Sequence, residues 1–320
     1  MKKNIQSQKI KRLSILIPVY QNSKNLPTTI SYLLSLTKYL KMIKLELVFI
    51  DDGSTDGSLE IIKNFSKKDF RIKWVKLTKN FGQSYAIKAG LNYTCGDCVV
   101  IISCDLQEPF MKITDMVQAW QSGSLFVIGE RVHREEGIFA KTFSFAYWLI
   151  VRSQKARDFP RLGYDFCLID RKIVNSLRFI KERNFNIFIS IWLLGYSAVR
   201  VPISRMKRSQ GKSQWNIFRK TKLVIDTLIT QSTLPLTVIF ILGMLCTFFS
   251  MAYFLIILSI WFLKSSAPSG WMTVVGLISL FGAFIMSALS IQSEYIKRIL
   301  EEVQDYPIFI VEDSNLKLQK

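Results

Sequence analysis

Residues 45–58, with the sequence LELVFIDDGSTDGS, join a short apolar run to an acidic turn that contains two glycines. The run is apolar apart from Glu46, and such continuity predicts a strand that is buried on both faces of a sheet. The strand is expected to end at Asp51 and Asp52, because Gly53 opens the turn. Two carboxylates therefore mark the carboxyl end of a buried strand.

The same alternation of strand and helix extends on both sides of this stretch. Further apolar runs of strand length occupy residues 13–20, 72–77, 98–102 and 125–128. Between them, apolar residues recur at helical spacing in the stretch after Pro27, at 59–65 and at 82–93. Strands that alternate with helices predict an α/β fold with a mainly parallel sheet.

Ligands bind beyond the carboxyl ends of the strands in such sheets. Polar clusters fall at these ends: Asp51-Asp52, Lys79-Asn80 and Asp105-Leu106-Gln107. Carboxylates at 51 and 52 suit hydrogen bonds from a nucleotide base or a ribose. The alternative for this turn is a plain Asx turn with a helix cap at Ser54 or Asp56.

The third cluster has the chemistry of a cation site. Asp105 and Gln107 lie two residues apart, so an extended backbone would point both side chains the same way. A carboxylate and an amide oxygen suit Mg²⁺ or Mn²⁺ together with phosphate oxygens. Two acidic strand ends along one sheet edge therefore predict a nucleoside-diphosphate site.

Composition and charge divide the 320-residue chain into a basic part and an apolar part. It has 43 Lys and Arg against 24 Asp and Glu, a net charge of +19, and 49% hydrophobic residues. That hydrophobic content excludes a disordered protein. Residues 227–263 and 265–293 contain no Asp, Glu, Lys or Arg, and each run exceeds the ~20 residues that a spanning helix needs. We therefore expect a membrane hairpin at 233–293.

The charge pattern also predicts topology. Basic residues beside a span are retained in the cytoplasm, so the domain at 1–213 and the tail at 294–320 are expected on that side of the inner (plasma) membrane, without a signal peptide. Segments 137–157 and 214–232 are basic and aromatic-rich, which predicts interfacial amphipathic helices; the alternative is core helices with a solvated basic edge. Contact with membrane lipids explains the positive charge, so nucleic-acid binding is not expected.

The ordered set of motifs resembles glycosyltransferase family 2. The segments are LSILIPVYQNSKNL (13–26), LELVFIDDGSTDGS (45–58), LTKNFGQSYAIKAGL (77–91) and ISCDLQEP (102–109). The chain is most similar to the polyprenyl-phosphate branch, the dolichyl-phosphate mannose synthase-like enzymes. This likeness continues through GYDFCLIDRKIV (163–174), RSQGKSQW (208–215), the membrane hairpin and EYIKRILEEVQDYPIFIV (294–311).

The resemblance implies a GT-A fold and an activity. The donor would be a UDP- or GDP-linked sugar, and the cofactor Mg²⁺ or Mn²⁺. The acceptor would be a polyprenyl phosphate, undecaprenyl phosphate in a bacterium, with inversion at the sugar. Such a phosphate is largely dianionic at cytoplasmic pH and needs no strong general base.

The resemblance also assigns residues to the site. The donor-nucleotide pocket would comprise Pro18, Tyr20, Asp51, Asp52, Lys79 and Gly82. The metal-binding DxDxQ segment would comprise Ser103, Asp105 and Gln107, and the catalytic positions would be Asp165 and Asp105. The lipid phosphate and the diphosphate would be held by Arg131, Arg205, Arg208 and Ser213.

Three motifs depart from the family pattern. Ser103 stands where the family has the first Asp of DxD, which removes an anionic ligand and should weaken metal binding. Gln21-Asn22 replaces the Asn-Glu of the family's PVYNE, and Cys167 replaces the Arg of its GDFRL. The change at Ser103 leaves open an alternative, a catalytically weak or inactive homologue that acts as a membrane scaffold.

A final expectation concerns the tail. Residues 308–311 have high strand propensity, and a lone apolar strand needs a sheet edge to pair with. The strand could pair with its own domain or with a neighbouring protomer. We take the second as a hypothesis for a homo-oligomer.

Overall fold

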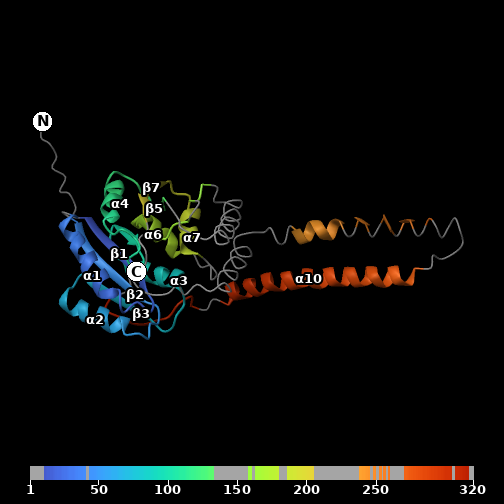
Figure 1. Ribbon diagram of the computed structural model, residues 1–320, viewed down its shortest axis with the longest axis horizontal. Helices are drawn as coiled ribbons and strands as arrows, with labels where there is room; N and C mark the ends of the chain where they lie inside the picture. Colours follow the sequence, from blue (N-terminus) through green and yellow to red (C-terminus); the bar gives the residue numbers. More distant parts are fainter. Residues whose placement is uncertain are drawn as a thin grey trace. The chain divides into compact units, whose positions relative to one another are not determined.

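The computed structural model describes most of the first two-thirds of the chain and one long helix near its end (Figure 1). The described residues are 11–40, 43–132, 158–160, 163–179, 186–204, 270–304 and 307–316, with parts of 238–259. The chain forms two compact units, one of residues 1–216 and 306–320, the other of residues 217–305.

The first unit is built on an eight-stranded mixed sheet. Its order is β7-β5-β6-β4-β1-β2-β3-β8. The strands are β1 (Lys11–Val19), β2 (Ile43–Asp51), β3 (Ile72–Leu77), β4 (Cys98–Ile101), β5 (Phe126–Arg131), β6 (Cys167–Asp170), β7 (Ala198–Ile203) and β8 (Val311–Ser314). Parallel pairs join β4, β1, β2 and β3, as well as β5 and β7. Strand β6 is antiparallel to β4 and β5, and β8 to β3.

Helices cover both faces of this sheet. They are α1 (Leu26–Ser35), the 3₁₀ helix η1 (Leu36–Lys38), α2 (Ser58–Lys68), α3 (Gln83–Leu91), α4 (Lys112–Gln121), α6 (Arg171–Arg178) and α7 (Ile187–Leu193). Leu13, Ile15 and Ile17 of β1 share one core with buried residues of α1, α2 and α4. The opposite face of β1 meets α3, where Gly90 lies against Leu16. The predicted α/β fold is confirmed, with a mixed sheet.

All five strands expected from the first part of the sequence are present, whereas β6 and β7 were not expected. Strand β6 (CLID) is as short as β4 (CVVI), but it ends at a charged residue, which weakens its apolar pattern. Strand β7 contains Pro202, which is tolerated because β7 lies at the edge of the sheet.

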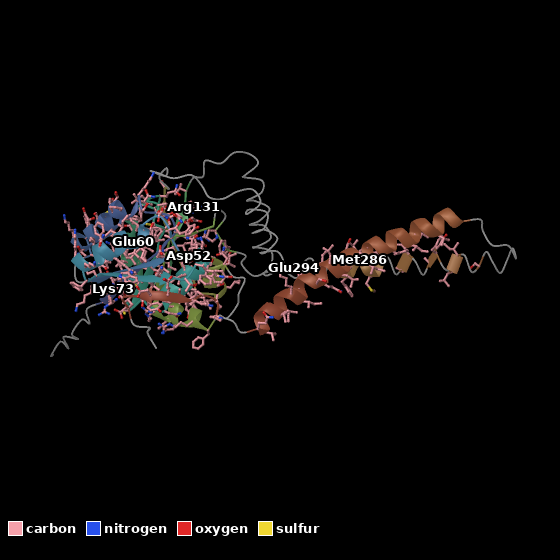
Figure 2. All side chains as sticks on the ribbon, turned by 90° about the horizontal axis from the view of Figure 1, so that it is seen from below. Asp52, Glu60, Lys73, Arg131, Met286 and Glu294 are labelled. Carbon is pink, nitrogen blue, oxygen red and sulfur yellow. The ribbon has the colours of Figure 1, made fainter. Side chains whose placement is uncertain are left out.

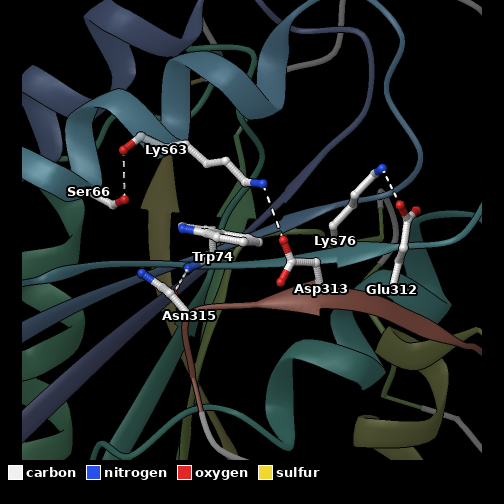
Figure 3. Close-up of polar contacts among 7 residues, drawn as sticks. All are labelled: Lys63, Ser66, Trp74, Lys76, Glu312, Asp313 and Asn315. Atoms are coloured by element: carbon white, nitrogen blue, oxygen red, sulfur yellow. Dashed lines mark hydrogen bonds and ion pairs between the residues drawn. The ribbon is translucent and has the colours of Figure 1, made fainter.

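The tail strand pairs with its own domain, so the neighbouring-protomer hypothesis is wrong for this structure. Strand β8 begins at Val311, three residues later than expected, and runs antiparallel to β3. Its polar contacts are drawn in Figure 3: Lys76 Nζ lies 2.7 Å from Glu312, and Lys63 Nζ lies 3.3 Å from Asp313. The amide of Asn315 accepts a hydrogen bond from the N–H of Trp74. The open edge of β3 is thereby covered from within the chain.

The second unit contains α10 (Trp271–Val303), a continuous helix of 33 residues. It carries exposed apolar side chains such as Met286, and its last part is charged from Glu294 onward (Figure 2). Within the described part of the chain, no helix is both long enough and apolar enough to cross a membrane. The hairpin at 233–293 therefore stays a prediction. Segments 137–157 and 214–232 lie outside the described residues.

Candidate active site

Asp52 ties two loops together at the carboxyl edge of the sheet. Its Oδ1 accepts a hydrogen bond from the N–H of Phe81 and its Oδ2 one from the N–H of Gly82, both at 2.8 Å. Burial raises the pKa of Asp52, and the two N–H donors offset part of that rise. This carboxylate therefore organises the loop after β3, where Lys79 and Gly82 were expected to meet the donor.

Gly53 permits this close approach. Its φ is +72°, and a Cβ there would lie 2.6 Å from the carbonyl carbon of Lys79 and 2.7 Å from the backbone nitrogen of Asn80. Two backbones in contact leave no room for any side chain, and the left-handed conformation favours glycine in its own right.

Gly53→Ala is expected to lower the free energy of unfolding by about 2 kcal/mol, since it adds a steric clash to the left-handed strain. Gly123→Ala is the matched control, because Gly123 has φ +106° and no described atom lies within 4 Å of the position that a Cβ would take there. Urea unfolding of both variants measures the difference. An equal loss of unfolding free energy in the two variants would show that the loops after β2 and β3 can move apart without an energetic cost.

Asp51 presents a buried acceptor at the end of β2. The side chain is fully buried, and its Oδ2 accepts a hydrogen bond of 3.3 Å from the N–H of Ser54. The other oxygen, Oδ1, has no hydrogen-bond partner among the described residues. Burial raises the pKa of this carboxyl. Buried polar atoms in folded proteins are normally satisfied, so Oδ1 is suited to an N–H or O–H group of a ligand.

Hydrogen bonds join the loop after β1 to the loop after β2. Gln21 has φ +52°, donates its backbone N–H to Ser54 and donates its side-chain amide to Thr55. Asp56 accepts from the backbone N–H groups of Ser23 and Ser58. The Asx turn is present at Asp56, but the expected helix cap at Ser54 or Asp56 is wrong, because Gly57 is the N-cap of α2 and no side chain caps it. Gln21 replaces the family's Asn in a structural role, beside the half-buried Pro18 and Tyr20.

The segment after β4 gathers oxygen atoms around Ser103. Its hydroxyl oxygen lies 2.7 Å from Asp105 Oδ1 and 2.5 Å from Glu108 Oε2, and Asp105 Oδ1 also accepts a hydrogen bond of 3.4 Å from the N–H of Gln107. The backbone is not extended, because Leu106 has φ +59°. The extended geometry assumed for Asp105 and Gln107 is therefore wrong. Glu108 was missed, although an acid directly before Pro109 is a visible signal.

These residues fit a divalent cation. The single hydroxyl proton of Ser103 can be donated to only one of the two carboxylates, Asp105 or Glu108. A cation bound by oxygens of both carboxylates would reduce the repulsion between them. Among the described residues, no group of three or more His, Cys, Asp or Glu is close enough to form a metal cluster. Mg²⁺ is usually held by only one or two carboxylates together with substrate phosphates. This segment can supply the carboxylates.

Ser103→Asp is expected to lower the melting temperature in EDTA, because it crowds a third carboxylate onto Asp105 and Glu108. Added Mn²⁺ should then raise the melting temperature of the variant more than that of the parent. Ser103→Asn is the neutral control of equal shape. An equal Mn²⁺ shift in all three proteins would exclude position 103 from the cation site.

Asp165 and Arg131 form an ion pair at the end of β5. Their side chains are 24% and 10% exposed, so the pair is mostly shielded from water. Asp165 therefore holds a guanidinium group and is not aligned as a solitary proton acceptor. Cys167, two residues on, is fully buried in β6, and its thiol contributes packing. The other residues expected to hold phosphates, Arg205, Arg208 and Ser213, lie outside the described residues.

Three clusters thus stand at the carboxyl ends of β2 and β3, of β4, and of β5. They are Asp51-Asp52 with Lys79–Gly82, Ser103–Glu108, and Arg131 with Asp165. Since β4, β1, β2 and β3 run parallel, the first two clusters share one sheet edge, as the sequence predicted.

A family model described as "Glycosyl transferase family 2" matches residues 14–178. The chain belongs to glycosyltransferase family 2. The match covers most of β1, all of β2 to β6 and all three clusters, so the expected GT-A fold and glycosyltransferase activity are confirmed at the level of the family.

Relatives of this family 2 chain align over almost its whole length. An uncharacterized glycosyltransferase of Synechocystis is 33% identical over 94% of this chain and 95% of its own. An undecaprenyl-phosphate 4-deoxy-4-formamido-L-arabinose transferase of Yersinia enterocolitica is 27% identical over 96% and 94%. A bactoprenol glucosyl transferase of Shigella phage SfII is 29% identical over 95% and 98%. The expected likeness to the polyprenyl-phosphate branch is confirmed.

Among solved structures, the family 2 chain is similar to a mannosyltransferase from Pyrobaculum calidifontis in complex with GDP-Man and Mn²⁺. The identity is 15%, the alignment covers 94% of this chain and 89% of that one, and the TM-score is 0.47.

Proposed function

We propose that this family 2 glycosyltransferase moves a sugar from a nucleoside-diphosphate sugar to a polyprenyl phosphate. The observation that carries the proposal is the shared sheet edge: Asp51, with a buried acceptor oxygen, ends β2, and the oxygen-rich segment Ser103–Glu108 follows β4, with only β1 between these two strands. An N–H group of the nucleotide base fits the acceptor at Asp51, and a diphosphate with its cation fits the segment Ser103–Glu108. The acceptor follows from the relatives, which are named for undecaprenyl phosphate and bactoprenol.

The reaction needs positioning more than proton transfer. A phosphate oxygen of the acceptor would attack the sugar C1 while the bond from C1 to the diphosphate breaks, which inverts the configuration at C1 and releases a nucleoside diphosphate. The acceptor is already anionic, so the protein must align it and neutralise the leaving group. A Mg²⁺ or Mn²⁺ ion held by Asp105 with Ser103, Glu108 or Gln107 would supply that positive charge.

The Arg131–Asp165 pair would serve the phosphates. Arg131 can present its guanidinium to an anion while Asp165 fixes its direction, which is a positioning task that needs no proton uptake. Lys79 is exposed beside the donor loop and is placed to meet a further phosphate.

We place the reaction at the cytoplasmic face of the inner membrane. The proposal rests on the uncharged runs at 227–263 and 265–293 and on the basic residues that precede them, which favour retention in the cytoplasm.

The test uses the full chain in detergent with a panel of UDP- and GDP-sugars, a short polyprenyl phosphate and Mn²⁺ or Mg²⁺. The expected result is a lipid-linked monosaccharide with one donor, and a nucleoside diphosphate released in equal amount. Failure with every donor would favour the scaffold alternative that Ser103 suggests, especially if donor hydrolysis is also absent with and without Mn²⁺.

A further inference from the structure

One lysine of β3, Lys76, connects the tail strand β8 to the side of the sheet where the donor is proposed to bind. Asp51 of β2 and Lys76 of β3 are direct neighbours in the parallel register, so their side chains leave the same face. Lys76 in turn lies 2.7 Å from Glu312 of β8 (Figure 3). The Lys76 side chain thus contacts the tail carboxylate Glu312 and leaves the sheet on the same face as Asp51.

The two carboxylates compete for the Lys76 ammonium. Asp51 is fully buried and its Oδ1 has no hydrogen-bond partner among the described residues, which makes it a strong attractor for a nearby cation. Contact with Glu312 chiefly raises the pKa of Lys76, and the charge of Asp51 adds to that rise. Burial raises the pKa of Asp51, and hydrogen bonds from Ser54 and, less strongly, the charge of Lys76 oppose that rise.

The tail also fixes the start of the donor loop. The N–H of Thr78 donates to the carbonyl of Ile310 at 3.1 Å, one residue before Lys79. The bulge in the pairing of β3 and β8 falls between Lys76 and Leu77. The side chain of Lys76 is therefore set by a strand that comes from a distant part of the sequence.

We propose that Glu312 is a positioning residue of the donor site: it holds the Lys76 ammonium on the tail strand and so keeps Asp51 Oδ1 open for an N–H or O–H group of the donor nucleotide. The inference rests on the proposed function, in which Asp51 faces the nucleotide. Without Glu312, Lys76 turns toward Asp51 and occupies the acceptor that the nucleotide needs.

The experiment measures the dissociation constants of UDP and GDP for the full chain by calorimetry. The variant Glu312→Gln should bind the preferred nucleotide about three to five times more weakly, the range expected for a partly exposed ion pair. Asp313→Asn is the matched control, because it neutralises the next carboxylate of the same strand, which pairs with Lys63 instead. Its binding should not weaken.

The direction of the change in nucleotide affinity distinguishes this proposal from a simple charge effect. Simple charge repulsion predicts the opposite, since removal of a negative charge near an anionic ligand should tighten binding. The double variant Lys76→Gln/Glu312→Gln removes the competing ammonium and should restore the affinity of the parent. Lys76→Gln alone should bind at least as tightly as the parent, and melting temperatures confirm that each variant is folded.

Equal or tighter binding by Glu312→Gln would overturn the inference, and so would a double variant that stays weak, because the loss would then come from the strand and not from Lys76. If the parent binds neither UDP nor GDP, the donor proposal itself fails and this inference falls with it. A parent that binds normally, with a Glu312→Gln variant that also binds normally, refutes the role of Glu312 alone.

Discussion

Asp105→Asn is expected to reduce sugar transfer by about 10²–10³-fold, the cost of removing one group that stabilises charge in a transition state. The substitution keeps the shape of the side chain and its contacts with the Ser103 hydroxyl and the Gln107 N–H. It removes the negative charge that a divalent cation needs, and Ser103 supplies no charge in its place. The loss should therefore appear in kcat at saturating donor and Mn²⁺.

The control for this prediction is Asp115→Asn on α4. Asp115 pairs with Lys112 at 2.8 Å within its own helix, so its neutralisation should leave turnover unchanged. The readout is the rate of lipid-linked sugar formation over a series of Mn²⁺ concentrations. Turnover of the Asp105 variant within about threefold of the parent would contradict the assignment of this segment as the cation site.

Asp165→Ala is expected to lower the free energy of unfolding by about 3 kcal/mol, the low end of the range for a buried pair that loses one partner. The reason is that Arg131, which is 10% exposed, would keep its charge without the carboxylate. A double variant, Arg131→Met/Asp165→Leu, should recover much of this loss because no buried charge remains. Denaturation followed by tryptophan fluorescence measures both.

The exposed ion pair of Arg200 and Glu130 provides the reference value for the loss of unfolding free energy. It joins β7 to β5 with side chains that are 44% and 35% exposed, and Glu130→Gln should cost less than about 1 kcal/mol. If Asp165→Ala costs no more than this, the Arg131–Asp165 pair is not a shielded one, and its positioning role in the site would be lost as well.

Local pattern was sufficient for the parallel core and for the acidic strand ends. Apolar continuity located β1 to β5, and the rule that ligands meet the carboxyl ends of parallel strands located Asp51, Asp52 and Asp105. These features depend on residues that are close in sequence, so periodicity and turn chemistry determine them.

The remaining features depend on contacts that no local pattern encodes. The left-handed conformation of Leu106 overrode the expected extended geometry, and it is this bend that accompanies the approach of Glu108 to Ser103. The pairing of Asp165 with Arg131 joins residues 34 apart along the chain. The partner of the tail strand depends on which sheet edge is open. The sequence alone allowed both the chain's own domain and a neighbouring protomer.

The pairing of β3 with β8 has a consequence for synthesis of the chain. Lys76 and Glu312 are 236 residues apart, and at a ribosomal rate of about 5–20 residues per second β3 waits roughly 10–50 s for its partner. During that interval a bare strand edge invites pairing with other nascent chains, and lysines on an edge are a known deterrent. Lys73 and Lys76 carry that charge on β3, while Glu312 and Asp313 bring the opposite charge on β8. Lys76, one of the two lysines that deter foreign strands, thus also forms the ion pair with Glu312 of the correct strand, which is synthesised much later.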